Sequence, residues 1–221
     1  FYSLKGTEGA TTAVLADGCY TIKVSKKVLE AESGAMTAGT NARIATNADT
    51  ATQKWYLTYQ NGFYTVTNVG SGLVLSLQTN GEVPGTNVQL AAADGSDAQL
   101  WRIDKVGSSY VLVNKYNGLI LDRVDSKSTA GTNVDVYRAK SNKAGEKWTF
   151  AQAALVTDGY MNIHTALSSK YVLGVKDLST KSGASVVLLK SADNQAYKWK
   201  VKGQGNEKYL IKNMNSNLYL G

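Results

Sequence analysis

A carboxylate and an aromatic side chain alternate with valines in one short run of the sequence, Val134-Asp135-Val136-Tyr137. In a β-strand, Asp135 and Tyr137 would point to the same side, because side chains two residues apart share a face. A further carboxylate, Asp122, ends an apolar run earlier in the chain. Carboxylates that exchange hydrogen bonds with hydroxyls, beside an aromatic ring that covers apolar C–H groups, are what a sugar pocket needs. The chemistry these residues suggest is non-covalent recognition.

Side chains that commonly do covalent or metal chemistry are scarce. The chain has one histidine, His164, and one cysteine, Cys19. A single cysteine cannot form an intrachain disulfide or a Cys-based metal cluster, and one histidine makes a conventional zinc site unexpected. No Gly-x-Ser-x-Gly, P-loop, dinucleotide-binding or zinc-protease motif is present. We therefore expect no enzyme activity, no cofactor and no metal. Paired acids for glycoside cleavage stay open, because their spacing is spatial.

A four-strand pattern that could position the polar groups is repeated along the chain. Residues 109–150 contain four short apolar runs separated by Gly, Asn and Ser, which predicts four strands and three turns. Their Gly-Thr-Asn turn at Gly131 recurs at Gly39 and Gly85. A shared spacing of turns and aromatic residues marks a repeat architecture. Four repeats are closed by a tryptophan each, Trp55, Trp101, Trp148 and Trp199, which are all the tryptophans of the chain.

The repeats predict two domains, 1–152 and 153–221. Repeats one to three span roughly 17–57, 61–103 and 109–150, repeat four spans 158–201, and repeat five begins near 206. The widest spacing between closing tryptophans, 51 residues from Trp148 to Trp199, places a linker near 151–156. The second domain is then incomplete. Its missing strands are expected from sequence beyond Gly221 or from another copy of the chain, which would donate residues 1–4.

Three four-stranded repeats that close with Gln-x-Trp resemble the ricin B-type lectin family, along nearly the whole chain. The resemblance implies an all-β fold, a β-trefoil, with one complete trefoil followed by a partial second trefoil. Its six-stranded barrel, capped by three hairpins, would leave no exposed sheet edge. The lack of paired cysteines points to the bacterial, cysteine-poor branch. The most specific marks are Gln53-Lys54-Trp55, Gln99-Leu100-Trp101 and Gly118-Leu119-Ile120-Leu121-Asp122.

The resemblance also implies two sugar-binding positions in each repeat. A carboxylate follows the Leu of the second strand, and an aromatic residue lies four residues after the Asn of Gly-Thr-Asn. Only repeat three has both, as Asp122 and Tyr137, and both are expected at the surface. The matching positions in the other repeats are Glu30 and Ala45, Ser76 and Ala91, and Gly174 and Leu189.

Three more residues complete the predicted carbohydrate-binding site in repeat three: Asp135, Asn133 of the turn, and Glu146. Glu146 replaces the first residue of Gln-x-Trp, which in the family helps to hold the site carboxylate. A second carboxylate beside Asp122 would repel it unless Arg123, Arg138 or a cation compensates. The alternative, that Asp122 caps a turn and Tyr137 is an ordinary strand residue, stays open.

Charge and hydropathy limit the partners. The net charge is +7, which permits attraction to acidic surfaces. No apolar run approaches the ~18 residues needed to span a bilayer, so membrane insertion is not expected. The lysines are scattered apart from a loose cluster, which is expected to be a solvated face rather than a nucleic-acid site. That cluster comprises Lys198, Lys200, Lys202, Lys208 and Lys212.

These observations predict a carbohydrate-binding, lectin-like module of a larger secreted or cell-surface bacterial protein, with a role in adhesion. Its partners would be glycans or polysaccharide, and other domains of the same polypeptide or neighbouring copies of the chain. One alternative is a structural spacer or protein-binding adhesin module with no sugar site, because the other repeats lack the carboxylate–aromatic pair. A second is a trefoil that binds an anionic polymer through its lysines.

Overall fold

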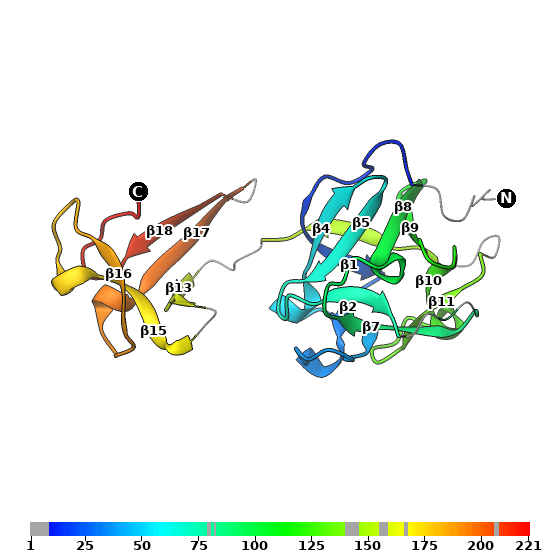
Figure 1. Ribbon diagram of the computed structural model, residues 1–221, viewed down its shortest axis with the longest axis horizontal. Coiled ribbons are helices and arrows are strands. Elements are labelled where there is room, and N and C mark those ends of the chain that lie inside the picture. The colour runs from blue at the N-terminus through cyan, green and yellow to red at the C-terminus, as the bar shows by residue number, and fades with distance from the viewer. Residues whose placement is uncertain are drawn as a thin grey trace. The chain divides into compact units, whose positions relative to one another are not determined.

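The computed structural model describes residues 9–78, 81, 83–139, 146–154, 159–165, 168–205 and 208–221. The chain divides into two compact domains, Phe1–Leu155 and Val156–Gly221, close to the boundary predicted after residue 152 (Figure 1). Residues 1–4, which were considered above as a donated strand, lie outside the described residues. The regular elements of both domains are β-strands and short 3-10 turns.

Six strands of the N-terminal domain close into a barrel. They are β1 (Gly18–Val24), β4 (Trp55–Gln60), β5 (Phe63–Asn68), β8 (Leu100–Val106), β9 (Ser109–Asn114) and β12 (Thr149–Gln152). The hydrogen-bonded order is β12-β1-β4-β5-β8-β9, in which each strand pairs with its neighbours. A bridge between Tyr110 and Trp148 completes the ring. Closure matters because an open sheet edge would present unpaired backbone groups.

Three hairpins, one from each repeat, accompany the barrel. They are β2 (Lys27–Ala31) with β3 (Ala42–Thr46), β6 (Val74–Leu77) with β7 (Thr86–Ala91), and β10 (Ile120–Arg123) with β11 (Val134–Tyr137). Strand β11 also pairs with β7, and two bridges, Asn41 to Gln89 and Arg43 to Asn133, join the remaining hairpin edges. A barrel with three such hairpins is a β-trefoil, which confirms the predicted fold class.

The Gly-Thr-Asn turns fasten each hairpin to the next around the threefold arrangement. The backbone N–H groups of Gly39, Gly85 and Gly131 donate to carbonyls of the neighbouring hairpin, each at 2.8 Å. All three glycines have φ between 86° and 92°, a left-handed conformation that side chains with a Cβ rarely adopt. The repeated glycine in the sequence therefore has a backbone cause. The accepting residues are Leu90, Val136 and Ile44.

The asparagines of the same turns form a closed ring of hydrogen bonds. Asn41 Nδ2 donates to Asn133 Oδ1 at 2.8 Å, Asn133 Nδ2 to Asn87 Oδ1 at 2.9 Å, and Asn87 Nδ2 to Asn41 Oδ1 at 2.9 Å. Each amide is thus both a donor and an acceptor, which suits its two kinds of polar atom. The ring joins residues that are 46 or 92 positions apart in the sequence.

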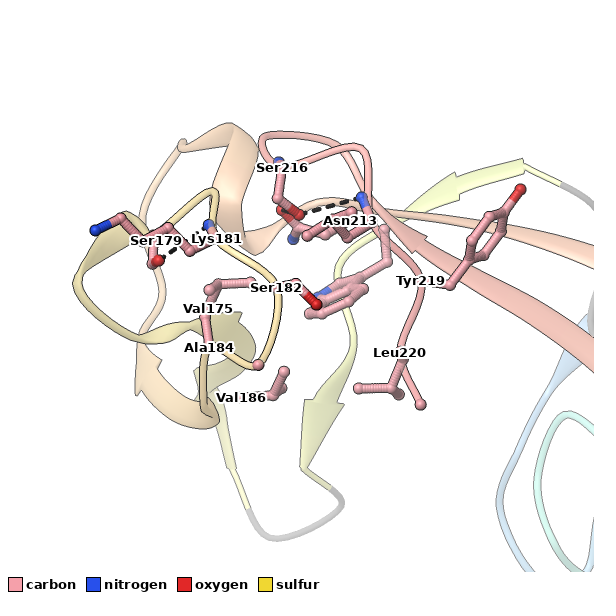
Figure 2. Close-up of a pocket in the computed structure, with 14 residues that line it drawn as sticks. Val175, Ser179, Lys181, Ser182, Ala184, Val186, Asn213, Ser216, Tyr219 and Leu220 are labelled. Carbon is pink, nitrogen blue, oxygen red and sulfur yellow. Dashed lines mark hydrogen bonds between the residues drawn. The ribbon is translucent and has the colours of Figure 1, made fainter.

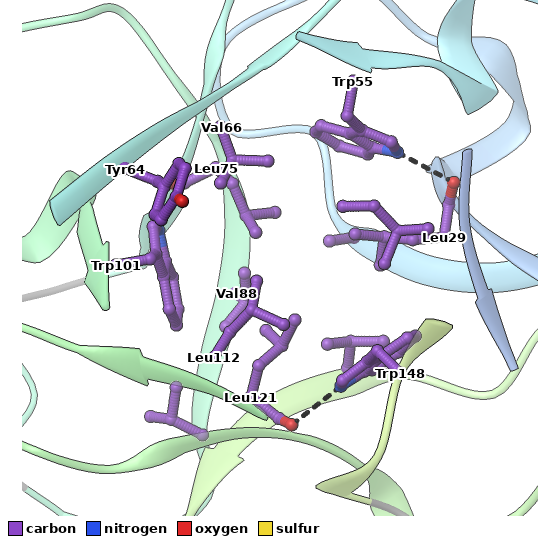
Figure 3. Packing of buried hydrophobic residues seen from close by; sticks show 14 of the residues in the cluster. Leu29, Trp55, Tyr64, Val66, Leu75, Val88, Trp101, Leu112, Leu121 and Trp148 are labelled. Carbon is purple, nitrogen blue, oxygen red and sulfur yellow. Dashed lines mark hydrogen bonds between the residues drawn. The ribbon is translucent and has the colours of Figure 1, made fainter. Parts of the chain in front are cut away.

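The closing tryptophans lie in the core of this domain at equivalent positions (Figure 3). Trp55, Trp101 and Trp148 are each 0% exposed, as predicted. Each indole Nε1–H donates to the carbonyl of a leucine on the second strand of its own repeat, at 2.9–3.1 Å. Burial of a large ring whose one polar group is satisfied is strongly stabilising. The accepting residues are Leu29, Leu75 and Leu121.

Short 3-10 turns recur at two places in the repeats. One set follows the second strand, and the other precedes the closing tryptophan. The first set is η1 (Glu32–Gly34), η4 (Val124–Ser126) and η6 (Lys176–Leu178), and the second is η2 (Ala51–Gln53), η3 (Asp97–Gln99) and η7 (Gln195–Tyr197).

None of the described helices is long and apolar enough to cross a membrane.

The C-terminal domain contains two three-stranded sheets, with strand orders β13-β17-β18 and β14-β15-β16. Trp199 is 1% exposed, and its Nε1 donates to Leu173 O at 2.8 Å, which repeats the contact made by the other tryptophans. Repeat four therefore folds locally like repeats one to three. The strands are β13 (Gly159–Met161), β14 (His164–Thr165), β15 (Ser168–Val175), β16 (Val186–Lys190), β17 (Trp199–Gly205) and β18 (Lys208–Asn213).

Candidate functional site

The hairpin of repeat three places the predicted carboxylates and the tyrosine on one face. Asp122 of β10 lies directly opposite Asp135 of β11, and Ile120 lies opposite Tyr137. Residues that alternate with these, including Val136, are fully buried against the barrel core. Because successive side chains point to opposite faces of a strand, Asp122, Asp135 and Tyr137 all lie on the side away from that core.

Burial of the two aspartates differs from the sequence-based expectation of a surface site. Asp122 is 5% exposed and Asp135 is 9% exposed, whereas Tyr137 is half-buried. The expected surface position of Asp122 is therefore wrong. Asp122 Oδ1 also accepts a hydrogen bond from the backbone N–H of Arg123 at 2.8 Å, which orients the carboxylate along its own strand.

Asp135 is electrostatically unsatisfied. Its Oδ1 is buried and has no hydrogen-bond partner among the described residues. Burial, and then the negative charges of Asp122 and Asp125, raise the pKa of Asp135 to about 6. Asp135 therefore holds its proton more tightly than an ordinary aspartate does. The cost of burying its carboxyl group is lowest when the group is protonated or accepts a hydrogen bond.

Arg123 is the arginine that accompanies the acidic residues. It is 1% exposed, and its Nη1 donates to Lys127 O at 2.7 Å in the loop after β10. Burial lowers the pKa of Arg123, and the charge of Asp122 opposes that shift. Arg138, the other compensating arginine considered above, is exposed. Glu146 is 3% exposed, two residues before the buried Trp148.

Repeat one neutralises its carboxylate within its own hairpin. Arg43 lies opposite Glu30 in the β2–β3 register, and its Nε contacts Glu30 Oε1 at 3.0 Å. Gln53 Nε2 donates to Glu30 Oε2 at 2.9 Å. Both oxygens of Glu30 are thus occupied, and the site is closed by Arg43. The register position of Arg43, two residues before Ala45, is the sequence signal that could have identified this interaction.

Repeats two and four lack a carboxylate at this position. In repeat two, Ser76 Oγ donates to the backbone carbonyl of Leu77 at 3.0 Å. In repeat four, a Cβ added to Gly174 would lie 2.6 Å from Cδ1 of Tyr197, so the tyrosine ring packs directly over the glycine. Tyr197 stands where repeats one and two have glutamine, and it fills the space of the site. Repeat three is therefore the one described repeat that combines carboxylates and an aromatic residue.

Asn133 is held mainly by the asparagine ring, in which its Oδ1 and Nδ2 both take part. It also lines an open cavity of about 320 Å³ in the loop between β10 and β11, together with Val124, Lys127 and residues 129–132. Asn133 thus connects the predicted site to the threefold ring. Within the described residues, no group of three or more His, Cys, Asp or Glu side chains is placed to hold a metal ion.

A cavity of about 270 Å³ in the C-terminal domain has a different character (Figure 2). It is lined by the turn around Gly183, by Val186 and by Leu218 to Gly221. Gly183 corresponds to Gly39, whose N–H bonds the neighbouring hairpin in the N-terminal domain. The cavity therefore corresponds to the surface against which the next hairpin packs in a trefoil, and we do not assign it a ligand.

The fold and the repeat-three hairpin together define a β-trefoil with the architecture of a lectin. The chain belongs to the family described as ricin-type beta-trefoil lectin domain-like, whose model matches residues 11–91, 51–137 and 144–221. No curated protein matches the chain significantly.

Solved structures share the fold. ThreeFoil, a designed 3-fold symmetric protein, is 26% identical with a TM-score of 0.59, and the match covers 62% of this chain and 100% of ThreeFoil. The Rhizoctonia solani agglutinin is 24% identical with a TM-score of 0.57, covering 65% of this chain and all of the agglutinin. A mosquitocidal holotoxin is 22% identical with a TM-score of 0.58, over 91% of this chain but 25% of the toxin.

Proposed function

We propose that the chain is a carbohydrate-binding module whose sugar site is the outer face of the β10–β11 hairpin. The observation that carries the proposal is the common face of Asp122, Asp135 and Tyr137, set by the hairpin register. Carboxylate oxygens accept hydrogen bonds from sugar hydroxyls, and the half-buried tyrosine ring offers an apolar surface to the sugar C–H groups.

The unpartnered Oδ1 of Asp135 supports this proposal, because a buried acceptor without a donor is unfavourable and a ligand hydroxyl would supply one. Glu146 and Asn133 take supporting roles in it. Glu146 occupies the position from which Gln53 holds Glu30 in repeat one, and Asn133 anchors the start of β11 through the asparagine ring.

Two lectins of the same fold have been solved with bound sugars. The Macrolepiota procera ricin B-like lectin was solved in complex with lactose, and the Polyporus squamosus lectin with a sialylated epitope. At 16% and 14% identity, these proteins share the fold alone. A single shallow site of this kind binds at roughly millimolar affinity. We therefore infer that adhesion by a secreted or cell-surface bacterial parent protein uses several copies and avidity.

A glycan array followed by calorimetry on the intact chain tests the proposal. Asp122→Asn keeps the size of the side chain but removes its charge, and Tyr137→Ala removes the ring. Each is expected to weaken binding about 10-fold or more, Asp122→Asn through loss of a charged hydrogen bond and Tyr137→Ala through loss of the ring that covers the sugar C–H groups. Glu30→Gln in repeat one and Tyr116→Ala, an exposed tyrosine outside the hairpin, are the matched controls and should bind normally.

The alternative function is a spacer or protein-binding module without a sugar site. It is favoured by the closure of the equivalent site by Arg43 in repeat one and by Tyr197 in repeat four. An array on which the folded chain binds no glycan would support the spacer and overturn the sugar-site proposal. Binding that survives both Asp122→Asn and Tyr137→Ala would place the sugar elsewhere.

A further inference from the structure

Most of the net charge of the chain lies in the smaller domain. Val156–Gly221 contains nine lysines, no arginine and four acidic residues, which gives +5 of the total +7. The N-terminal domain, more than twice as long, carries the remaining +2. Such an imbalance concentrates the attraction for anions on one domain.

Four of these lysines lie on one face of the β13-β17-β18 sheet, here called the lysine face. Trp199 and Val201 of β17 are buried, so Lys200, which alternates with them, points outward. Trp199 matches the core residue Trp55, so this outward side corresponds to the outside of the barrel in a complete trefoil. The lysine face consists of Lys200, Lys202, Lys208 and Lys212, of which the first three are exposed and Lys212 is half-buried.

The lysine face brings like charges together without local compensation. Lys200 lies directly opposite Lys212 across β17 and β18. Like charges at directly opposite positions destabilise a sheet, and an anion between them removes that cost. Lys198, just before β17, pairs with Asp193 at 2.6 Å, but no ion pair is described for the four lysines of the face. The three strands contain no Asp or Glu; Glu207, between β17 and β18, lies outside the described residues.

Aromatic rings flank the two opposed lysines. Tyr160 of β13 lies opposite Lys200, is 64% exposed, and has its ring centroid 5.4 Å from Lys200 Nζ. On the other side, Lys212 Nζ lies 5.5 Å from the ring centroid of Tyr219. Tyr160, Lys200, Lys212 and Tyr219 thus form a single row across the sheet. Cation–π contacts hold the ammonium groups in place on this row.

From this arrangement we infer that the lysine face binds an anionic polysaccharide. Carboxylate or sulfate groups of the polymer lie between Lys200 and Lys212, and a sugar ring packs on Tyr160. Base-specific binding of duplex nucleic acid fits less well, because bases are read by an element that enters a groove, and this face is the surface of a three-stranded sheet. The site is independent of repeat three and of the neutral sugar proposed there.

Binding of heparin, a polyuronate and neutral dextran to the intact chain, measured at rising NaCl concentrations, tests the inference. The two anionic polymers should bind, with an affinity that falls steeply with salt, and dextran should not bind at this face. Lys200→Gln with Lys212→Gln should weaken binding roughly fivefold for each lysine removed. Lys176→Gln with Lys190→Gln removes the same charge from exposed positions of the same domain and should change binding little.

Several results would overturn the inference. Equal losses in the two double variants would show a response to net charge alone. Absence of binding at low salt would exclude the site. Tighter binding of duplex DNA, or of vesicles of anionic phospholipid, than of heparin at equal charge concentration would assign the face to a different partner. Thermal melts should show that both double variants are folded, with the Lys200→Gln and Lys212→Gln variant at least as stable as the parent chain, because removing two opposed charges removes their repulsion.

Discussion

Asp135 lies directly opposite Asp122 across β10 and β11, in the register position that Arg43 occupies opposite Glu30 in β2 and β3. One scaffold thus carries two opposite electrostatic arrangements. In repeat one the carboxylate is neutralised by its cross-strand partner at 3.0 Å, whereas in repeat three the partner is a second carboxylate. Two neighbouring carboxylates resist double ionisation, which makes repeat three sensitive to pH and open to a ligand that supplies hydrogen-bond donors.

The stability of the N-terminal domain should depend on the ionisation of Asp135. Folding raises its pKa from 3.8 to about 6, so the folded state holds the proton more tightly than the unfolded chain. The stability that Asp135 contributes is therefore full below about pH 4 and is lost as the pH rises through about 6. Asp135→Asn should raise the free energy of unfolding at pH 8 by on the order of 1–3 kcal/mol, and change it little at pH 4.

Urea denaturation of the parent and Asp135→Asn across this pH range measures the effect. Asp125→Asn is the control, because Asp125 lies in the turn after β10 of the same hairpin but is exposed and paired with Lys127 at 3.0 Å. It should change stability by a few tenths of a kcal/mol. A parallel pH profile for the parent and Asp135→Asn would show that Asp135 ionises normally in the folded state.

The closing tryptophans should contribute equally to the core. Trp148→Ala is expected to lower the free energy of unfolding by ~3–5 kcal/mol, because it leaves a cavity and removes the hydrogen bond to the carbonyl of Leu121. Trp101→Ala should cost a similar amount, since the ring is equally buried and donates to Leu75 O. Chemical denaturation followed by circular dichroism measures both. The free energy of unfolding of Tyr116→Ala should stay within about 0.5 kcal/mol of the parent. A loss of stability in Tyr116→Ala as large as in the tryptophan variants would contradict a packing effect specific to the tryptophans.

The asparagine ring should behave as one unit. Asn87→Ala or Asn133→Ala removes two hydrogen bonds and leaves one donor and one acceptor unpaired, so each should cost about 1–3 kcal/mol. Thermal melts compare them with Gln60→Ala, at an exposed position at the end of β4. If Asn133 also contacts sugar, Asn133→Ala alone should weaken glycan binding. Equal binding by the two ring variants would limit Asn133 to a structural role.

The two domains should differ in autonomy. A fragment of residues 1–155 contains the whole closed barrel, so we expect it to unfold cooperatively at the temperature of the corresponding transition in the full chain. A fragment of residues 156–221 exposes large apolar side chains, including Leu188 at 56% and Tyr171 at 48%. It should therefore self-associate or unfold without a cooperative transition. Calorimetry and size-exclusion chromatography distinguish these outcomes, and a stable monomeric 156–221 fragment would refute the partial-trefoil interpretation.

The sequence by itself was sufficient for the fold. The spacing of Trp55, Trp101 and Trp148 predicted three equivalent buried positions, because a repeated local motif packs in the same way each time it occurs. The recurrence of Gly-Thr-Asn predicted the hairpin turns, since glycine is needed at positive φ. The alternation of Asp135 and Tyr137 predicted their common face, since side-chain direction along a strand is a local property.

Tertiary structure alone decided the electrostatic state of each site. The hairpin register sets Arg43 opposite Glu30, but the exposure that weights their 3.0 Å ion pair, 25% for the Arg43 side chain and 9% for that of Glu30, is set by the folded domain. Tyr197 lies over Gly174 because a segment from the end of repeat four returns to its hairpin. The burial of Asp122 and Asp135, which are 5% and 9% exposed, likewise arises in the folded domain and not from the strand pattern. Burial and distance set the energy of a charge, and both are properties of chain segments that meet only after folding.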